Sequence, residues 1–300
     1  MQRLLSHRCY NVTIILILRR FYKESCVLVS YCGTEWYGKS KKVVKSVAKA
    51  KIIAVANQKG GVAKTTTSVN LAACLAHYKK KVLLIDLDPQ GNASSGLGIN
   101  KNALEHSVYD VLVNFVPIDK ITVEINKRLS VLPARVELAG AEMELVAAIS
   151  REMRLKNALD EVKDKYDYII IDTPPSLGLL TLNALTAADT FLVPIQCEYY
   201  ALEGLSQLLS TIKLVQKNLN PGLQMEGILL TMYDNRTNLS NQVVADVQEN
   251  FKEKVFQTII PRNVRLSEAP SFGQSILDYD AKSKGAATYL ALAKEVIKHG

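Results

Sequence analysis

The sequence predicts an α/β fold in which a doubly wound, mostly parallel sheet carries helices on both faces. Short, continuously apolar segments alternate with longer segments of helical periodicity from residue 51 onward, and strands that are buried on both faces have this continuous apolar character. The chain has 300 residues, of which 48% are hydrophobic and 22% charged, enough to bury the core of one large domain. A ligand of such a domain is expected at the carboxyl ends of its strands.

Seven segments are predicted as strands because aliphatic and β-branched residues dominate them. They are Lys51–Asn57, Lys81–Asp86, Arg128–Pro133, Tyr168–Asp172, Thr190–Gln196, Glu226–Met232 and Lys254–Ile260. Seven segments with apolar residues three or four positions apart are predicted as helices. They lie near residues 65–78, 137–147, 151–164, 178–187, 201–218, 239–251 and 283–298.

Residues 1–50 differ in composition from the rest of the chain. They contain 10 of the 37 Lys and Arg residues but only two of the 29 Asp and Glu residues, so residues 51–300 carry 27 of each sign and no net charge. They also hold three of the five cysteines and the single tryptophan. We therefore expect residues 1–47 to be an extension foreign to the domain, which would occupy residues 48–300 as a single unit.

Three interpretations of this extension compete. A basic segment poor in acidic residues is typical of an organellar transit peptide, and Val12–Leu18 resembles a signal-peptide core, although seven residues are too few to span a bilayer. Alternatively, the start codon is assigned too early and the native chain begins near Val47. We favour the last interpretation, because the segment has neither a small-residue cleavage site nor a periodicity that would pack on a domain.

Composition also excludes several functions. The domain has no net charge, so any affinity for DNA must come from a local basic patch. Cys74 and Cys197 have no C-x-x-C partner, and the four histidines are scattered along the chain, so neither a disulfide framework nor a His or Cys metal site is predicted. The cysteine pattern implies a reducing cytosol.

A phosphate-binding loop is predicted between the first strand and the first helix, at Lys59–Thr67. Gly60 and Gly61 would let successive backbone amides point inward, Lys64 would reach the terminal phosphates, and the Thr65 hydroxyl would hold Mg²⁺. Gln58 and Ala63 stand where the strict motif has glycines. The alternative is a Gly-Gly turn that happens to precede a helix.

Three aspartates fall at the ends of predicted strands. Asp172 ends the apolar run that starts at Tyr168, which is the Walker B arrangement that delivers a carboxylate to Mg²⁺. Asp86 and Asp88 are two positions apart and face the same side of an extended chain. The alternatives are a strand-terminal Asp that opens the Thr173–Pro175 turn and a plain Asp-Pro turn.

Four ordered blocks of the chain resemble the deviant-Walker ATPases, and most closely the ParA/Soj chromosome- and plasmid-partitioning proteins. The blocks are Asn57–Thr67, Asp86–Asn92, Ile169–Ser176 and Ile260–Pro270, and the resemblance extends over roughly residues 50–298. It implies a P-loop ATPase that dimerises around ATP and Mg²⁺, binds DNA without sequence preference, and partitions a chromosome, plasmid or other cargo with a ParB/Spo0J-type adaptor. It also implies a cytoplasmic, nucleoid-associated protein without stable insertion into a membrane.

The resemblance assigns roles residue by residue. Lys59 would reach the phosphates of a partner subunit, as an arginine finger does, and Lys64 and Asp88 would complete the catalytic set, with Asp88 positioning the attacking water. The nucleotide contacts would be Lys59, Gly60, Gly61, Val62, Ala63, Lys64, Thr65 and Thr66, with Pro261 and Asn263 beside the adenine. Thr65, Asp86 and Asp172 would lie at the metal, and Arg236 and Arg265 would contact DNA. If the loop needs a positive φ at Ala63, its methyl group costs on the order of 1 kcal/mol, and we expect activity to be retained.

Two other functions compete with partition. A MinD-like division-site regulator that cycles on a membrane would end in a basic amphipathic helix, whereas Ala286–His299 has the spacing of a helix docked on its own domain. A DNA-binding regulator that uses ATP only as a conformational ligand would need an operator-reading domain, and no helix-turn-helix segment precedes residue 51.

Overall fold

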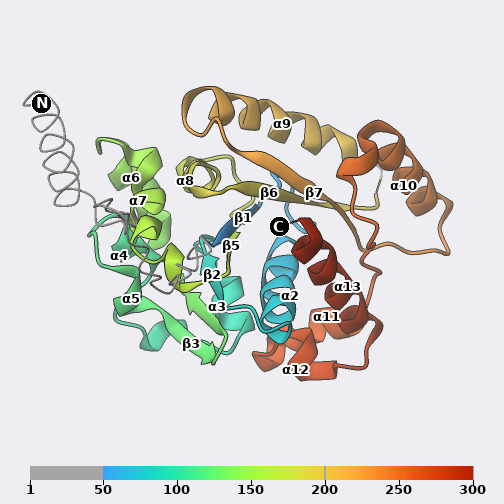
Figure 1. Ribbon diagram of the computed structural model, residues 1–300, viewed down its shortest axis with the longest axis horizontal. Coiled ribbons are helices and arrows are strands. Elements are labelled where there is room, and N and C mark those ends of the chain that lie inside the picture. The colour runs from blue at the N-terminus through green and yellow to red at the C-terminus, as the bar shows by residue number, and fades with distance from the viewer. Residues whose placement is uncertain (1–49, 199–200, 300) are drawn as a thin grey trace, which may run out of the picture. The chain divides into compact units, whose positions relative to one another are not determined.

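The computed structural model describes residues 50–198 and 201–299. The predicted extension, residues 1–47, lies outside the described residues and stays a prediction. Over the described residues seven strands form one sheet, which confirms the α/β prediction (Figure 1). The strands are β1 (Lys51–Val55), β2 (Val82–Asp86), β3 (Val123–Asn126), β4 (Leu129–Leu132), β5 (Tyr168–Asp172), β6 (Thr190–Gln196) and β7 (Gln224–Thr231).

The register of the central strands positions the predicted site. The strand order is β3-β4-β2-β5-β1-β6-β7, and every neighbouring pair is parallel except β3 and β4. The sheet extends from β1 to both sides, so a topological switch point, where ligands of such sheets bind, lies beside this strand. Asp172 at the end of β5 is aligned with Val55 on one side and with Asp86 on the other. The two aspartates therefore meet at the edge from which the loop after β1 departs.

Helices cover both faces of the sheet. One face carries α2 (Lys64–His77), α3 (Asn92–Gly96), α11 (Val264–Glu268), α12 (Ile276–Asp280) and α13 (Lys284–His299). The other carries α4 (Val108–Leu112), α5 (Ile118–Ile121), α6 (Leu138–Leu145), α7 (Arg154–Asp160), α8 (Leu179–Ala187), α9 (Ala201–Asn218) and α10 (Asn238–Phe251). Short 3-10 helices are η1 (Lys101–Ala103), η2 (Arg151–Met153), η3 (Lys163–Lys165), η4 (Lys252–Lys254) and η5 (Ala269–Phe272).

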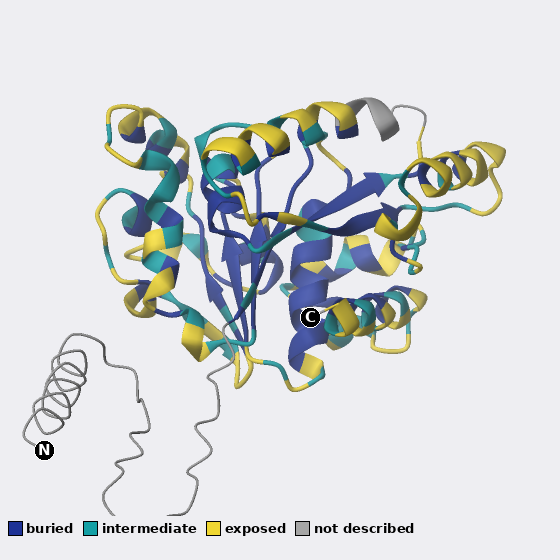
Figure 2. Cartoon of the chain, turned by 45° about the horizontal axis from the view of Figure 1, so that its top comes forward, coloured by how far each residue is buried: buried dark blue, intermediate teal, exposed yellow. Residues whose placement is uncertain are grey.

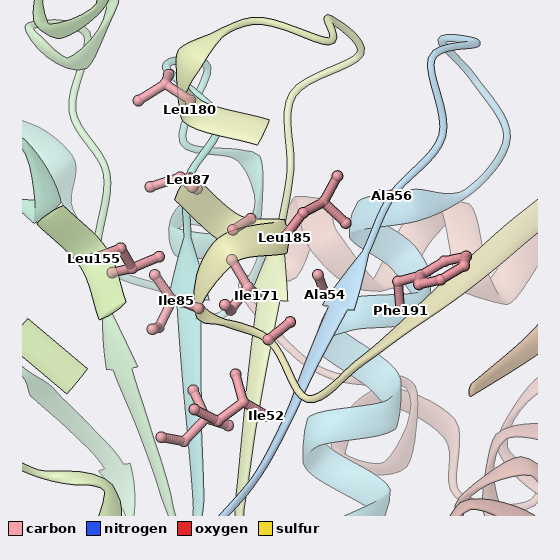
Figure 3. Packing of buried hydrophobic residues seen from close by; sticks show 14 of the residues in the cluster. Ile52, Ala54, Ala56, Ile85, Leu87, Leu155, Ile171, Leu180, Leu185 and Phe191 are labelled. Carbon is pink, nitrogen blue, oxygen red and sulfur yellow. The ribbon is translucent and has the colours of Figure 1, made fainter. Parts of the chain in front are cut away.

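Alternate residues of each central strand enter different cores. Ile52 and Ala54 of β1 pack with Ile85 and Ile171 on the face of α7 and α8 (Figure 3), whereas Ile53 faces α2 and α13. The central strands β1, β2 and β5 are buried over almost their whole length, and exposed residues lie mainly on helices and loops (Figure 2). Burial on both faces explains why the strand segments read as continuously apolar.

The predicted strand Lys254–Ile260 is wrong. Its segment meets β7 in one isolated bridge, between Val255 and Ile228, and the amides of Phe256 and Ile260 donate to β7 carbonyls at 2.9 Å, without forming a continuous ladder. The amides of Gln257 and Thr258 donate to the two carboxylate oxygens of Glu295 on α13, at 2.9 and 3.0 Å. Because these donors are taken by a side chain, the ladder with β7 cannot continue.

A short antiparallel strand was missed at the opposite edge of the sheet. β3 alternates half-buried and exposed residues and forms a hairpin with β4, in which the Asn126 side chain accepts the amides of Arg128 and Leu129. The alternation in Val123–Asn126 was visible in the sequence. The five-residue helices α3, α4, α11 and α12 and the four-residue α5 were also missed, because so few residues do not define a helical period.

Helix α13 is attached to α2 through a buried hydroxyl pair. The Tyr289 hydroxyl lies 3.2 Å from the Thr67 hydroxyl, and both side chains are fully buried. Leu292 and Val296 of α13 are also inaccessible to solvent, which agrees with the docked helix expected from the sequence. No helix in the described part of the chain is long and apolar enough to cross a bilayer.

We predict that Tyr289→Phe destabilises the domain by about 1–2 kcal/mol, because it leaves the Thr67 hydroxyl buried without this partner. For a domain of this size the melting temperature should fall by about 2–6 °C, measured by differential scanning calorimetry. Tyr233→Phe is the matched control, since its hydroxyl donates to Asn241 at the surface. Equal melting temperatures for the two variants would contradict the prediction.

Candidate functional site

The loop between β1 and α2 has the backbone that a phosphate cradle requires. Gly61 and Ala63 have φ values of 73° and 65°, in the left-handed region, so the positive φ anticipated at Ala63 is present. A Cβ added at Gly60 or Gly61 would meet no atom within 4 Å, which leaves the space in front of the loop open. The Thr231 hydroxyl at the end of β7 donates to the carbonyl of Val62 at 3.2 Å and holds the loop against the sheet.

Lys64 is the first residue of α2 and is 7% exposed. Its ammonium group donates to the carbonyl of Lys59 at 3.0 Å. Burial lowers the pKa of Lys64, and the charges of Asp172 and Asp88 oppose that shift. The lysine therefore lies inside the loop among carboxylates, where a bound polyphosphate would give it anionic oxygens to contact.

Asp172 fits a role in holding a cation. Its Oδ1 accepts the Ser68 hydroxyl at 2.9 Å, whereas its Oδ2 is buried without a hydrogen-bond partner within the described chain. Burial raises the pKa of Asp172, the Asp86 charge raises it further, and the Thr65 and Ser68 hydroxyls partly offset the shift. A cation at Oδ2 would compensate this charge.

The oxygen ligands near the loop fit Mg²⁺ that is shared with a substrate phosphate better than they fit a metal ion bound by protein side chains alone. No cluster of three His, Cys, Asp or Glu side chains occurs in residues 50–198 and 201–299. Mg²⁺ is usually held by one or two carboxylates, substrate phosphates and water. Asp172 and Thr65, beside a phosphate loop, are compatible with that arrangement.

Asp86 and Asp88 look equivalent in the sequence but differ in the structure. The Asp86 carboxylate is fully buried: Oδ2 accepts the amide and hydroxyl of Ser94 at 2.7 and 2.6 Å, and Oδ1 accepts the Asp88 amide at 3.3 Å. Asp88 is 8% exposed, and its Oδ1 accepts the Gln90 amide at 2.9 Å. These contacts indicate that Asp86 anchors α3 and the Asp88 turn. Its predicted place at the metal stays a prediction.

Stability should depend on pH through Asp172 and Asp86. Burial raises both carboxyl pKa values, so the folded state holds protons that the unfolded chain releases above an ordinary carboxyl pKa of about 4. Stability falls with rising pH wherever the folded state binds more protons. We therefore predict that the melting temperature of the protein without nucleotide and metal falls by a few degrees as the pH rises from mildly acidic to neutral, measured by differential scanning fluorimetry.

Asp172→Asn should flatten this dependence, because an amide does not titrate. The surface variant Asp246→Asn on α10 is the control and should keep the wild-type dependence. Parallel pH profiles for wild type and Asp172→Asn would contradict the assignment.

A cleft of about 460 Å³ opens beside the phosphate loop. Ala63 and Thr66 line one side, and the predicted adenine residues Pro261 and Asn263 line the other. The structure thus brings these residues together across about 200 positions of sequence. Asn263 also uses its Oδ1 to accept the Arg265 amide at 2.8 Å, as the N-cap of α11.

The two arginines predicted to contact DNA lie on separate exposed segments. Arg236 follows β7 and is 82% exposed, and Arg265 lies in α11 and is 55% exposed. Each is paired with a carboxylate of its own segment, Asp234 or Glu268. The sequence analysis did not anticipate these pairs.

One further residue near the site was missed. Glu142 of α6 accepts the Leu180 amide at 3.3 Å, at the N-terminus of α8. A Cβ at Gly178 would come within 2.2 Å of the Glu142 carboxylate. Glu142 therefore accepts a free amide at the N-terminus of α8, the helix that follows the Thr173–Pro175 turn. The sequence did not predict this contact, because the two residues are 38 positions apart and no local pattern links them.

Comparisons with known proteins agree with this geometry. A protein-family profile described as an AAA domain matches residues 50–225. The chain is 64% identical over 251 residues to the sporulation initiation inhibitor protein Soj of Bacillus subtilis, covering 83% of this chain and 99% of Soj. It is 56% identical over 267 residues to the chromosome partitioning protein ParA of Myxococcus xanthus, covering 89% of this chain and 94% of ParA.

A solved structure with the same fold as this chain contains a bound nucleotide. It is described as cobyrinic acid a,c-diamide synthase from Mycobacterium smegmatis with bound ADP and magnesium. Its TM-score is 0.74 at 42% sequence identity, over 83% of this chain and 95% of that one.

Proposed function

This chain belongs to the ParA/Soj family of chromosome-partitioning ATPases, and from that premise we propose that it is an ATP-switched dimer that binds DNA and partitions cargo. It hydrolyses ATP with Mg²⁺ as cofactor. The observation that carries the proposal is the buried Lys64 inside an open glycine loop, with Asp88 and Asp172 around it and the cleft beside it.

Different residues of the loop and the cleft bind different parts of the nucleotide. The amides of Gly60 to Thr66 and the positive end of α2 hold the phosphates, and Lys64 supplies a charge to the terminal ones. The base occupies the cleft between Ala63 and Pro261. Thr65 and Asp172 would hold Mg²⁺, which would supply positive charge to stabilise the transferring phosphoryl group.

Asp88 acts on the attacking water. Its position next to Lys64 and its slight exposure allow it to orient a water at the terminal phosphate. Asp86 keeps the Asp88 turn in place through the Asp88 and Ser94 amides. A structural role of this kind requires burial, which Asp86 has.

The side chain of Lys59 is assigned to the nucleotide site of a second copy of the chain in the dimer. Its backbone closes the loop, because its amide donates to Asn57 and its carbonyl accepts Lys64, while its side chain is partly exposed. A lysine held in this way contributes charge to a nucleotide on a second copy. Hydrolysis then needs dimerisation, and a ParB/Spo0J-type adaptor sets its rate.

The membrane-cycling alternative finds no support in α13. Five apolar residues of this helix are buried against the domain, namely Ala286, Tyr289, Leu292, Ala293 and Val296, and Leu290 and Ile297 are half-buried. A membrane-binding helix needs such a face free. This burial supports our proposal that the ATP state binds nucleoid DNA rather than a membrane.

We predict that the full chain binds DNA with ATP and barely with ADP, because a dimer doubles the phosphate contacts. Arg265→Ala should weaken binding equally for unrelated sequences and lower the slope of log affinity against log salt by about two per dimer. Filter binding across a salt series measures both quantities. Equal affinity with ADP and ATP, or an unchanged slope, would contradict DNA binding, and flotation with anionic liposomes would then test the membrane alternative.

A further inference from the structure

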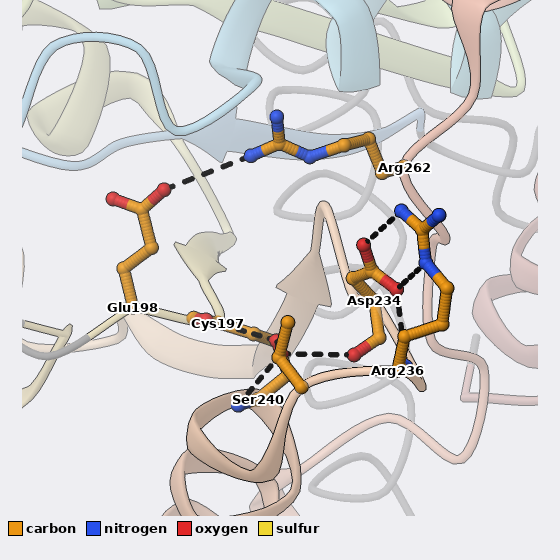
Figure 4. Close-up of polar contacts among 7 residues, drawn as sticks. Cys197, Glu198, Asp234, Arg236, Ser240 and Arg262 are labelled. Carbon is orange, nitrogen blue, oxygen red and sulfur yellow. Dashed lines mark hydrogen bonds and ion pairs between the residues drawn. The ribbon is translucent and has the colours of Figure 1, made fainter.

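Three arginines on the surface beside the cleft are each paired with a carboxylate. The pairs are Arg236 with Asp234, Arg262 with Glu198, and Arg265 with Glu268. The first two pairs lie side by side (Figure 4), because the Arg262 amide donates to the Tyr233 carbonyl at 3.0 Å and joins the two segments. The positive charge of this surface is therefore neutralised within the chain.

The Arg236 pair has the geometry of phosphate recognition. Arg236 Nε donates to Asp234 Oδ1 at 2.9 Å and its Nη2 donates to Oδ2 at 2.6 Å. This two-point contact is the one that a guanidinium makes with two oxygens of a phosphate. The carboxylate of Asp234 therefore occupies the Nε–Nη2 edge of Arg236, one of the two edges through which the guanidinium can contact an anion at two points, although the arginine side chain is 82% exposed.

The three carboxylates are held differently. Glu268 also accepts a hydrogen bond from the Tyr279 hydroxyl at 3.0 Å, and Arg265 forms a second ion pair with Asp280 at 3.7 Å. Glu198 lies 3.8 Å from Arg262. The hydrogen bonds recorded for the Asp234 carboxylate all come from Arg236, including its amide at 3.1 Å. The hydrogen bonds from Arg236 also lower the pKa of Asp234.

We propose that Asp234 is an internal competitor that masks Arg236 from the DNA phosphate backbone, so that DNA binding exchanges one anion for another. The proposal rests on the proposed DNA-binding function and adds a regulator to it. Binding requires a phosphate to displace the carboxylate, and the displaced Asp234 then lies beside the polyanion. Masking of this kind keeps the DNA affinity of a single subunit low, so that stable DNA binding needs the doubled contacts of a dimer.

The test is Asp234→Asn, which removes the charge and keeps an oxygen that can accept the Arg236 amide. With a non-hydrolysable ATP analogue and a random-sequence duplex, affinity should rise by about 2- to 10-fold, the factor expected when an exposed pair at each of two sites no longer competes. The salt slope should steepen by about one per subunit, because Arg236 then neutralises a phosphate without a neighbouring anion. Turnover of ATP without DNA should be unchanged.

Two further variants separate masking from a general charge effect. Asp246→Asn removes one negative charge from an exposed position of α10 and should leave affinity within about 1.5-fold, because Asp246 is not the partner of Arg236, Arg262 or Arg265 in their ion pairs. In the Arg236→Ala background, Asp234→Asn should give no gain, since the competitor has nothing to mask. A gain that persists in that background, or no gain in Asp234→Asn, overturns the proposal.

DNA binding by the wild type distinguishes an error in the masking proposal from an error in the proposed function. If the wild type binds DNA with ATP and Asp234→Asn does not exceed it, masking is wrong and the partition role stands. If neither protein binds DNA in any nucleotide state, both are wrong.

Discussion

Lys64→Ala is expected to lower the affinity for ATP by at least about 100-fold. A hydrogen bond to a charged group contributes about 1.5–3 kcal/mol, and in the proposed binding mode this ammonium contacts two phosphates. Its removal also leaves the charges of Asp172 and Asp88 near the triphosphate without the lysine charge that they now interact with. Isothermal titration calorimetry measures the loss.

Lys59→Ala is the matched control for this prediction. Its side chain is partly exposed and it contributes to the loop through its backbone, so ATP binding should change by only a few-fold while hydrolysis is lost. A melting temperature for Lys64→Ala close to that of the wild type would show that the fold survives. Near wild-type ATP affinity in Lys64→Ala would remove the phosphate-loop assignment.

The parts of the site that the sequence predicted well depend on neighbours along the chain. An apolar strand, two glycines and a helix start occur within about fifteen residues around Gly60, and such local order predicts both the loop and the helix end behind it. The positive φ at Ala63 follows from the same geometry. Parallel pairing then brings Asp172 to the loop, because the carboxyl ends of parallel strands share one edge.

The parts that the sequence did not predict depend on distant partners. Residues 254–260 have strand composition, but Glu295 on α13 takes two of the amides that a strand would use. Asp86 and Asp88 have the same spacing and chemistry, and only Ser94 distinguishes them by burying one carboxylate. The spacing of apolar residues along the chain does not indicate which distant side chain will take a backbone hydrogen bond.

The arginine pairs are an intermediate case. Asp234 stands two residues before Arg236, and Glu268 stands three after Arg265, so both neighbours were visible. What the sequence could not provide is the two-point geometry at Arg236, since it depends on how the chain turns after β7. A residue assigned to DNA by resemblance can therefore be neutralised by its own neighbour.

Asp88→Ala is expected to slow ATP turnover by at least about 100-fold while ATP binding and dimerisation persist. A positioned acid or base contributes about 10²–10⁴-fold to such reactions, and the variant removes the carboxylate without touching the amides that hold phosphate. ATP affinity should stay level or rise, because one negative charge near the triphosphate is lost. Phosphate release, isothermal titration and a sizing column with ATP measure the three quantities.

Asp88→Asn distinguishes the charge of the residue from its role in the turn. The asparagine oxygen can still accept the Gln90 amide, so the Asp88–Gly91 turn is kept, but an amide cannot take a proton from water. If the carboxylate orients and activates water, Asn should be as slow as Ala, and both variants should accumulate as ATP-bound dimers. Turnover near the wild-type rate in Asp88→Asn would mean that the residue only shapes the turn, and a monomeric Asp88→Ala with ATP would mean that it builds the dimer.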